Sequence, residues 1–240
     1  MIRSLSFLFL LAVLALLAGC AVGPTQTADN KVEAERQFAL GDYQQAAQSY
    51  ISLSQQADGN ERTQLLLRAS AAFARADNLY QARQIFKSIQ VDAGNPTQVL
   101  LSQLVESHIA LMERRPGDVL LNLSAKPSPS IPAAYLADYH HVRADAYTML
   151  GNRLETAREL VRREKYLTDP ILVEANQKAI WQALAMLSER ALQQLRSDPP
   201  PDVLSGWMQL VQITKAYQLQ PKSLNQAVTR WRQAVSYTHL

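Results

Sequence analysis

The chain has 240 residues, of which 48% are hydrophobic, and this is enough to bury the core of one ordinary domain. Its formal charge is only +3, and acidic residues are interleaved with the basic ones, so the sequence offers no single-sign surface for nucleic acid. The single cysteine excludes an internal disulfide and a cysteine-based metal site, while the 8 glycines and the abundant Ala and Leu favour helix over strand.

Residues 1–19 are predicted to be a lipoprotein signal peptide. Arg3 gives a positive start, and the apolar run Leu5–Ala18 is too short to span a bilayer, which needs about 20 residues. The run ends in Leu17-Ala18-Gly19-Cys20, which resembles the lipobox of bacterial lipoproteins. This resemblance implies that the Cys20 thiol receives a diacylglycerol and that cleavage makes Cys20 the new N-terminus. The alternative is an ordinary signal peptide with an accidental cysteine.

The sequence after Cys20 predicts a membrane anchor and a short tether. Position 21 is Ala and not Asp, and by resemblance to lipoprotein sorting in two-membrane bacteria this implies the outer membrane, with the protein facing the periplasm. Two or three acyl chains give stable anchoring where one is marginal. Residues 20–29 contain Gly, Pro and Thr without apolar periodicity, so we expect a disordered tether there.

Residues 30–235 are predicted to form one helical-repeat domain. Stretches rich in Gly, Pro, Asn and Asp divide this region into about twelve helices. The predicted helices cover 30–40, 43–56, 61–75, 79–90, 97–114, 117–124, 132–150, 153–165, 171–187, 189–196, 202–217 and 221–234. The longest non-helical stretch, Ser124–Ile131, is a stiff Pro-rich connector that lets the two halves of the domain differ in orientation.

An internal repeat indicates how these helices are arranged. Gly41–Ala46 and Tyr50 resemble the second half of a tetratricopeptide repeat, in which a small residue at the helix crossing lies between two aromatic residues. The small position recurs at steps of 34 to 38 residues: Ala46, Ala82, Val119, Ala157, Ala191 and Ala227. The sequence therefore predicts an all-α fold, a tetratricopeptide-like helix-hairpin repeat solenoid of about 10–12 helices that offers a surface to other proteins.

The sequence contains no motif for catalysis, for a cofactor or for a metal. HExxH, GxxxxGK, GxGxxG, GxSxG and CxxC are all absent. His140 and His141 are adjacent and point about 100° apart on a helix, so they cannot chelate one metal together. We expect all four histidines to face solvent or to cap helices: His108, His140, His141 and His239. The mixed charges of residues 155–165 are expected to pair on a solvated face, and the sequence predicts no enzyme.

The last third of the chain carries a more specific resemblance. Trp181-Gln182-Ala183-Leu184, then Gly206-Trp207 with Leu210, and finally Trp231 resemble the N-terminal domain of LpoA proteins, a family of outer-membrane lipoprotein activators of a class A penicillin-binding protein. The tryptophans are expected to pack in the core of the last hairpins. The resemblance implies a non-enzymatic regulator of peptidoglycan synthesis, with a class A penicillin-binding protein as partner, no cofactor and no nucleic acid. It identifies no partner-contact residues.

The resemblance also implies a missing part. Members of the family continue into a C-terminal domain similar to a periplasmic binding protein, which is credited with docking the synthase. Residues 236–240 depart from the family pattern and are expected to be a foreign or truncated end. The alternative function is a helical-repeat lipoprotein of the outer-membrane protein assembly machinery. A third, a lipid-anchored peptidoglycan hydrolase, requires a polar cleft that the sequence does not indicate.

Overall fold

The computed structural model describes residues 24–195 and 202–235, which form twelve α-helices and no strand. Each helix corresponds to one predicted from the sequence, so the all-α fold is confirmed. The signal peptide, Cys20 and the expected foreign end 236–240 lie outside the described residues. The helices are α2 (Pro24–Leu40), α3 (Tyr43–Ser54), α4 (Gly59–Arg75), α5 (Leu79–Lys87), α6 (Pro96–Met112), α7 (Pro116–Asn122), α8 (Ala133–Met149), α9 (Arg153–Glu164), α10 (Pro170–Ala185), α11 (Glu189–Leu195), α12 (Val203–Tyr217) and α13 (Pro221–Val235).

The first helix begins earlier than the sequence predicts. α2 starts at Pro24, so residues 24–29, expected to belong to a disordered tether, are helical. Proline is well suited to the first position of a helix, because its φ is already close to the helical value and its missing N–H would have no helical partner there. Pro24 is therefore a helix start and not the loop signal expected from the sequence.

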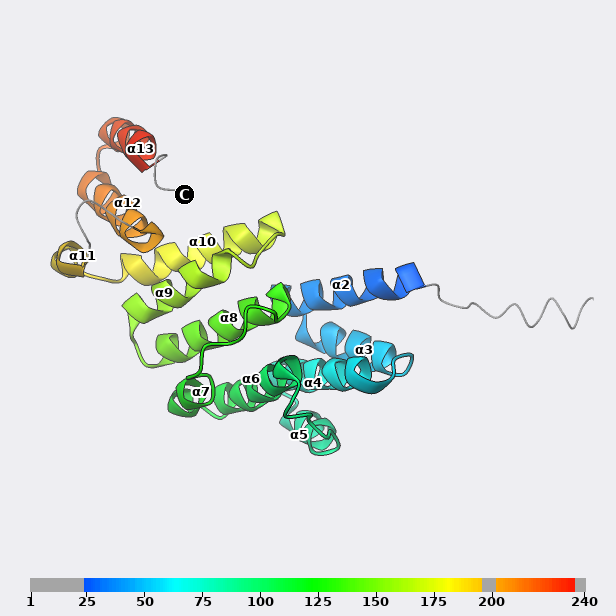
Figure 1. The fold of residues 1–240 in the computed structure, drawn as a ribbon. Coiled ribbons are helices and arrows are strands. Elements are labelled where there is room, and N and C mark those ends of the chain that lie inside the picture. The colour runs from blue at the N-terminus through cyan, green and yellow to red at the C-terminus, as the bar shows by residue number, and fades with distance from the viewer. Residues whose placement is uncertain (1–23, 196–201, 236–240) are drawn as a thin grey trace, which may run out of the picture.

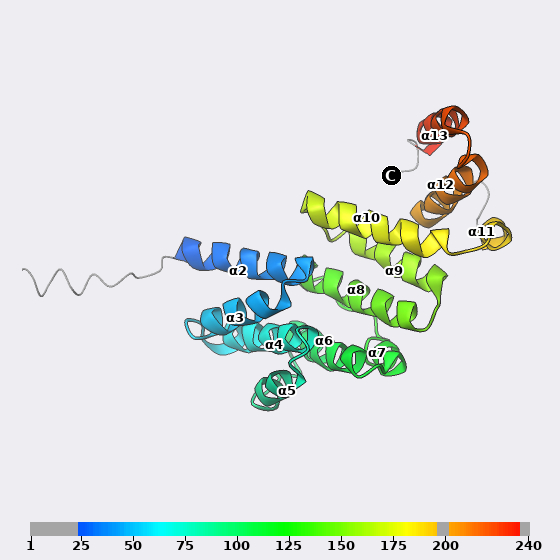
Figure 2. The same ribbon diagram turned by 180° about the vertical axis from the view of Figure 1, so that it is seen from behind.

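The helices pair into hairpins that stack side by side and curl into a solenoid (Figure 1). α3 packs against α4 and α8 against α9, while α4, α6 and α8 contact one another in succession. The view from behind shows that α2 lies close to the start of α8, although the five helices α3 to α7 separate them in the chain (Figure 2). Arg36 Nε in α2 lies 2.8 Å from Oδ2 of Asp169, the residue before α10. The curl therefore brings the first helix back to the fifth hairpin.

The turns inside the first four hairpins have the same geometry. In each turn a residue with positive φ lies two positions before the second helix: Gly41 (93°), Asp77 (61°), Arg114 (60°) and Gly151 (73°). The N–H of the next residue donates to the carbonyl five positions earlier, with bonds of 2.8–2.9 Å in all four turns. This is the hydrogen bond of the Schellman motif, which satisfies a carbonyl at the end of the preceding helix. The sequence repeat thus corresponds to a structural repeat through α9.

The small residues of the repeat lie where the helices cross, but only in these four hairpins. Ala46, Ala82, Val119 and Ala157 are all 0% exposed. In α11 the buried position is Leu192, one residue after the expected Ala191, and in α13 the expected Ala227 is only partly buried. The last two registers of the repeat are therefore wrong. The described part of the fifth hairpin lacks the left-handed turn that fixes the register of the first four, so its buried residue falls at another position.

Two apolar clusters form the core, and α8 contributes to both. Val142 and Ala146 of α8 pack in the first cluster, which extends back to α2, whereas Ala144 packs in the second, with α9 to α12. The Pro-rich connector does not divide the domain. The Tyr139 hydroxyl of α8 bonds to the carbonyl of Leu123, just before the connector, at 2.9 Å and to that of Ala125, within it, at 3.2 Å. The connector, which was expected to let the two halves differ in orientation, is therefore hydrogen-bonded to α8. The boundary between the two cores runs through α8 itself.

Candidate functional site

The predicted lipidation site cannot be described structurally, because Cys20 lies outside the described residues. Within 24–195 and 202–235, every helix is too short or too polar to cross a bilayer. The same residues contain no cluster of three or more His, Cys, Asp or Glu side chains arranged to hold a metal ion. The candidate functional features of these residues are buried charges and a cleft lined by α2, α8, α9 and α10.

A chain of buried charges links the inner helices. Arg68 of α4 is 1% exposed, and its Nη2 donates to Glu35 Oε2 of α2 at 2.6 Å while its Nη1 donates to Asp138 Oδ2 of α8 at 2.7 Å. The guanidinium also lies 3.9 Å from the centre of the Phe38 ring. An arginine suits this place because its planar fork can serve two carboxylates and an aromatic face at once. The charges connect three helices that are far apart in the sequence.

His108 of α6 extends this chain. Its Nε2 lies 3.2 Å from Asp138 Oδ2, and its side chain is 2% exposed, so the expectation that it faces solvent is wrong. Burial alone raises the pKa of Asp138, but His108 and Arg68 beside it outweigh burial and hold that pKa well below its usual range. The carboxylate is therefore ionised, and its Oδ2 serves both partners while its Oδ1 is buried without a hydrogen-bond partner. A polar residue in an apolar run, such as Arg68 in the Leu65–Ala74 stretch, was the signal available in the sequence.

Glu159 of α9 is the centre of a second set of charges. Its carboxylate is 1% exposed and lies 2.7 Å from His140 Nδ1, 3.2 Å from Arg143 Nε and 3.0 Å from Arg162 Nη1. Burial by itself raises the pKa of Glu159, but the hydrogen bond from His140 and the charge of Arg143 outweigh burial. The pKa therefore lies below its ordinary value. The expectation that residues 155–165 pair on a solvated face is thus wrong for Glu159, because this carboxylate anchors α9 to α8. Arg158 and Glu155 do pair on the partly exposed side.

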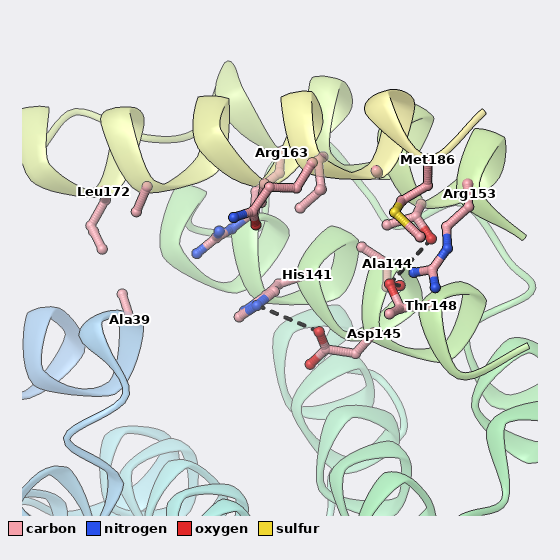
Figure 3. A pocket seen from close by; sticks show the side chains of 15 residues that line it. Ala39, His141, Ala144, Asp145, Thr148, Arg153, Arg163, Leu172 and Met186 are labelled. Carbon is pink, nitrogen blue, oxygen red and sulfur yellow. Dashed lines mark hydrogen bonds and ion pairs between the residues drawn. The ribbon is translucent and has the colours of Figure 1, made fainter. Parts of the chain in front are cut away.

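The large cleft lies between the end of α2 and helices α8, α9 and α10 (Figure 3). Its volume is about 500 Å³, which is in the range of small-molecule sites. His141 and Asp145 enter it from α8, with His141 Nε2 3.7 Å from Asp145 Oδ1, and Asp145 is held by Arg75 Nη1 at 3.0 Å. Burial lowers the pKa of His141 to about 4, so the imidazole is neutral at pH 7. The sequence did not indicate this polar cleft.

Arg163 of α9 is the one cleft residue whose charge is both buried and without a carboxylate partner among the described residues. It is 7% exposed, and its side chain points from α9 into the cleft in Figure 3. Its Nη1 donates to Asn176 Oδ1 at a long 3.3 Å, and its Nε has no hydrogen-bond partner. Burial lowers the pKa of this guanidinium below its usual value. Thr156, Leu160 and Arg163 share one helix face, so their spacing placed Arg163 on a buried stripe.

Two of the three tryptophans pack as expected. Trp181 of α10 and Trp207 of α12 lie against the second apolar cluster, whereas Trp231 of α13 is half-buried outside it. They do not line the cleft, whose wall is made by smaller residues. Trp181 and Trp207 therefore contribute to the packing of the last hairpins.

Comparison with known proteins gives a consistent result. A family model described as LppC putative lipoprotein matches residues 42–239. The penicillin-binding protein activator LpoA of Vibrio antiquarius is 28% identical over 215 residues, which is 90% of this chain and 34% of the relative. LpoA of Vibrio cholerae serotype O1 is 26% identical over 185 residues, which is 77% of this chain and 30% of that protein. The chain thus spans about a third of the length of these curated relatives.

Solved structures show the same fold. The LpoA N-terminal domain from Haemophilus influenzae matches with a TM-score of 0.65 at 20% identity, covering 79% of this chain and 85% of that domain. The amino-terminal domain of E. coli LpoA matches with a TM-score of 0.68 at 20% identity, covering 79% of this chain and 84% of that domain. At this identity the likeness concerns the fold, and it confirms the helical-repeat architecture.

Proposed function

We propose that this chain, which belongs to the family of LppC putative lipoproteins, is the helical-repeat part of an activator of a penicillin-binding protein. It acts on peptidoglycan synthesis as a regulator and not as an enzyme. The observation that carries the proposal is the 28% identity to the Vibrio antiquarius activator over 90% of this chain. Because the chain spans only 34% of that relative, the activity of the whole protein is part of the proposal.

The charges of the domain support a scaffold. The carboxylates of Glu35, Asp138 and Glu159 are each held by arginine or histidine side chains, and so they are occupied in joining helices. A catalytic carboxylate must instead face its substrate with a pKa suited to proton transfer. Stacked hairpins of this kind present an extended surface that suits a protein partner. The reported relatives are named for a penicillin-binding protein, which favours this function over a role in outer-membrane protein assembly.

The proposal includes a location and a class of partner. Leu17-Ala18-Gly19-Cys20 supports lipidation at Cys20, and Ala21 supports the outer membrane with the domain facing the periplasm. α2 begins four residues after Cys20 and its 17 residues span about 25 Å, since a helix rises 1.5 Å per residue. The helix thus carries the chain from the anchor into the solenoid. The partner is a class A penicillin-binding protein that synthesises peptidoglycan.

Membrane fractionation and affinity capture test the two parts separately. Metabolic palmitate should label the protein and place it in the outer-membrane fraction, while Cys20→Ser should abolish both the label and this location. A tagged class A penicillin-binding protein from the same bacterium should retain the gene product that contains this chain. Retention by a barrel-assembly protein instead would establish the alternative function. Unchanged palmitate labelling of Cys20→Ser would refute the anchor.

A further inference from the structure

The cleft between α2 and α8–α10 contains a buried guanidinium that makes no ion pair with the described residues, although the charges of Asp138 and Asp145 act on it from further away. Arg163 is 7% exposed and has no carboxylate within ion-pair distance among the described residues. Arg68, which is buried more deeply, pairs with Glu35 and Asp138, and the partly buried Arg75 pairs with Asp145. An unpaired buried charge is strongly unfavourable, because the lost hydration has to be replaced by a counter-charge or by hydrogen bonds.

The hydrogen bonds of Arg163 do not replace that hydration. A guanidinium has five N–H donors, and the bond that this one makes is 3.3 Å long, to Asn176 Oδ1. Asn176 itself is fixed by donating from Nδ2 to the Leu160 carbonyl at 3.0 Å, so its oxygen is turned towards Arg163. Nε is buried with no partner. The guanidinium is therefore held in place while most of its donors are unused.

We propose that this cleft is a binding site for a small carboxylate ligand, with the Arg163 guanidinium as the anion-binding group. A carboxylate matches the planar fork and accepts two parallel hydrogen bonds from it. Among the lining residues Asp145 is paired with Arg75, His141 is neutral and Arg153 is partly exposed. Arg163 is therefore the buried positive charge that a carboxylate meets in this cleft. This inference does not depend on the proposed function.

The rest of the cleft indicates what the carboxylate is attached to. Ala144, Leu160 and Met186 give apolar wall, whereas Thr148, Thr156 and Gln182 bring hydroxyl and amide groups. A volume of about 500 Å³ holds a small molecule and no folded segment. The lining therefore fits a short-chain acid or the C-terminal end of a short peptide. Both present the same carboxylate chemistry.

Titration calorimetry of the purified chain with three probes tests the site. Acetyl-alanyl-alanine carries a C-terminal carboxylate, its amide is the same peptide without the charge, and butyrate is a carboxylate without peptide groups. We expect acetyl-alanyl-alanine to bind at least about tenfold more tightly than its amide, since a hydrogen bond to a charged group contributes about 1.5–3 kcal/mol. Butyrate binding as tightly as the peptide would identify a free acid as the source, and weaker butyrate binding a peptide end.

Arg163→Gln should weaken binding of acetyl-alanyl-alanine at least about tenfold. Without ligand, it should leave the thermal midpoint equal or higher, because it removes an unpaired buried charge. Arg62→Gln makes the same chemical change at an exposed position of α4 and should change neither. If Arg163→Gln does not fold, Ala175→Glu keeps the test available: Ala175 is exposed at the edge of the cleft, and a carboxylate there should repel the ligand.

Four results would overturn the proposal. The first two are no heat of binding for acetyl-alanyl-alanine or butyrate, and equal affinity for acetyl-alanyl-alanine and its amide. The other two are tighter binding of inorganic phosphate than of acetyl-alanyl-alanine, and equal affinity of the Arg163→Gln and Arg62→Gln proteins for acetyl-alanyl-alanine. A purely structural role for Arg163 predicts the last of these together with a lowered thermal midpoint.

Discussion

Asp138→Asn should destabilise the domain more than any exposed charge substitution. Asp138 is 5% exposed, and its Oδ2 lies 2.7 Å from Arg68 Nη1 and 3.2 Å from His108 Nε2. The amide removes the negative charge with little change in volume, and it leaves Arg68 with Glu35 as its remaining counter-charge. Removing one partner of a buried pair costs about 3–5 kcal/mol, and the contact with Glu35 places the expected loss near the lower end, about 3 kcal/mol.

This free energy corresponds to a clear shift of the melting curve. For a domain of this size each kcal/mol lowers the thermal midpoint by about 2–4 °C, so Asp138→Asn should lower it by about 6–12 °C. Circular dichroism at 222 nm reports the loss of helix, and urea unfolding gives the free energy independently. Asp118→Asn is the matched control, because Asp118 pairs with Arg115 where both side chains are about half exposed, and it should change the midpoint far less.

The lowered pKa of Asp138 also makes the stability of the domain depend on pH. The pKa of Asp138 is lowered in the folded protein, so below the ordinary value of about 4 the unfolded chain takes up a proton that the folded one does not. The contribution of Asp138 to stability is present above that value and is lost as the pH falls. Asp138→Asn should remove part of this acid sensitivity. If the thermal midpoint of Asp138→Asn lay within about 2 °C of the wild-type value, the buried pair of Asp138 and Arg68 would not hold α4 to α8.

Three other predictions concern separate parts of the fold. Since burial lowers the pKa of His141 to about 4, we expect its imidazole proton resonances to titrate near pH 4 in NMR, and titration near 6.5 would contradict this. The free energy of unfolding should fall by up to about 3 kcal/mol between pH 6.5 and 4, and it should fall less in His141→Gln. Gly151→Ala should lower the free energy of unfolding in urea by about 1 kcal/mol, because φ is 73° there while the space around a Cβ is open. Arg114→Gly, at φ 60°, should leave this free energy unchanged or raise it, and the opposite order of the two variants would exclude backbone strain as the cause. Ala82→Leu should cost about 1–3 kcal/mol by overpacking a residue that is 0% exposed, as measured by thermal unfolding, and an unchanged midpoint would mean that α4 and α5 do not approach closely.

The helices and hairpins of this protein were predictable because their signals are local. Prolines begin α6, α7 and α10, and Asn78 and Asn152 accept from backbone N–H groups at the starts of α5 and α9. Each of these signals acts within one turn of helix, so it is readable without the fold. The repeat of small residues is local in the same sense for the first four hairpins, where one turn geometry fixes the register.

The partners of the buried charges and the cleft were not predictable, because they depend on contacts between distant residues. Arg68 meets Asp138 across 70 positions, and Arg36 meets Asp169 across 133. Nothing in the sequence around His108 or Glu159 distinguishes a buried partner from a solvated one, since exposure is set by how tightly the hairpins curl. The sequence by itself determined a stack of helix pairs, through signals that act within single turns. Only the curl of that stack, which follows from summed packing angles, decided which buried charges form ion pairs. The same curl buried Arg163 without a carboxylate within ion-pair distance among the described residues.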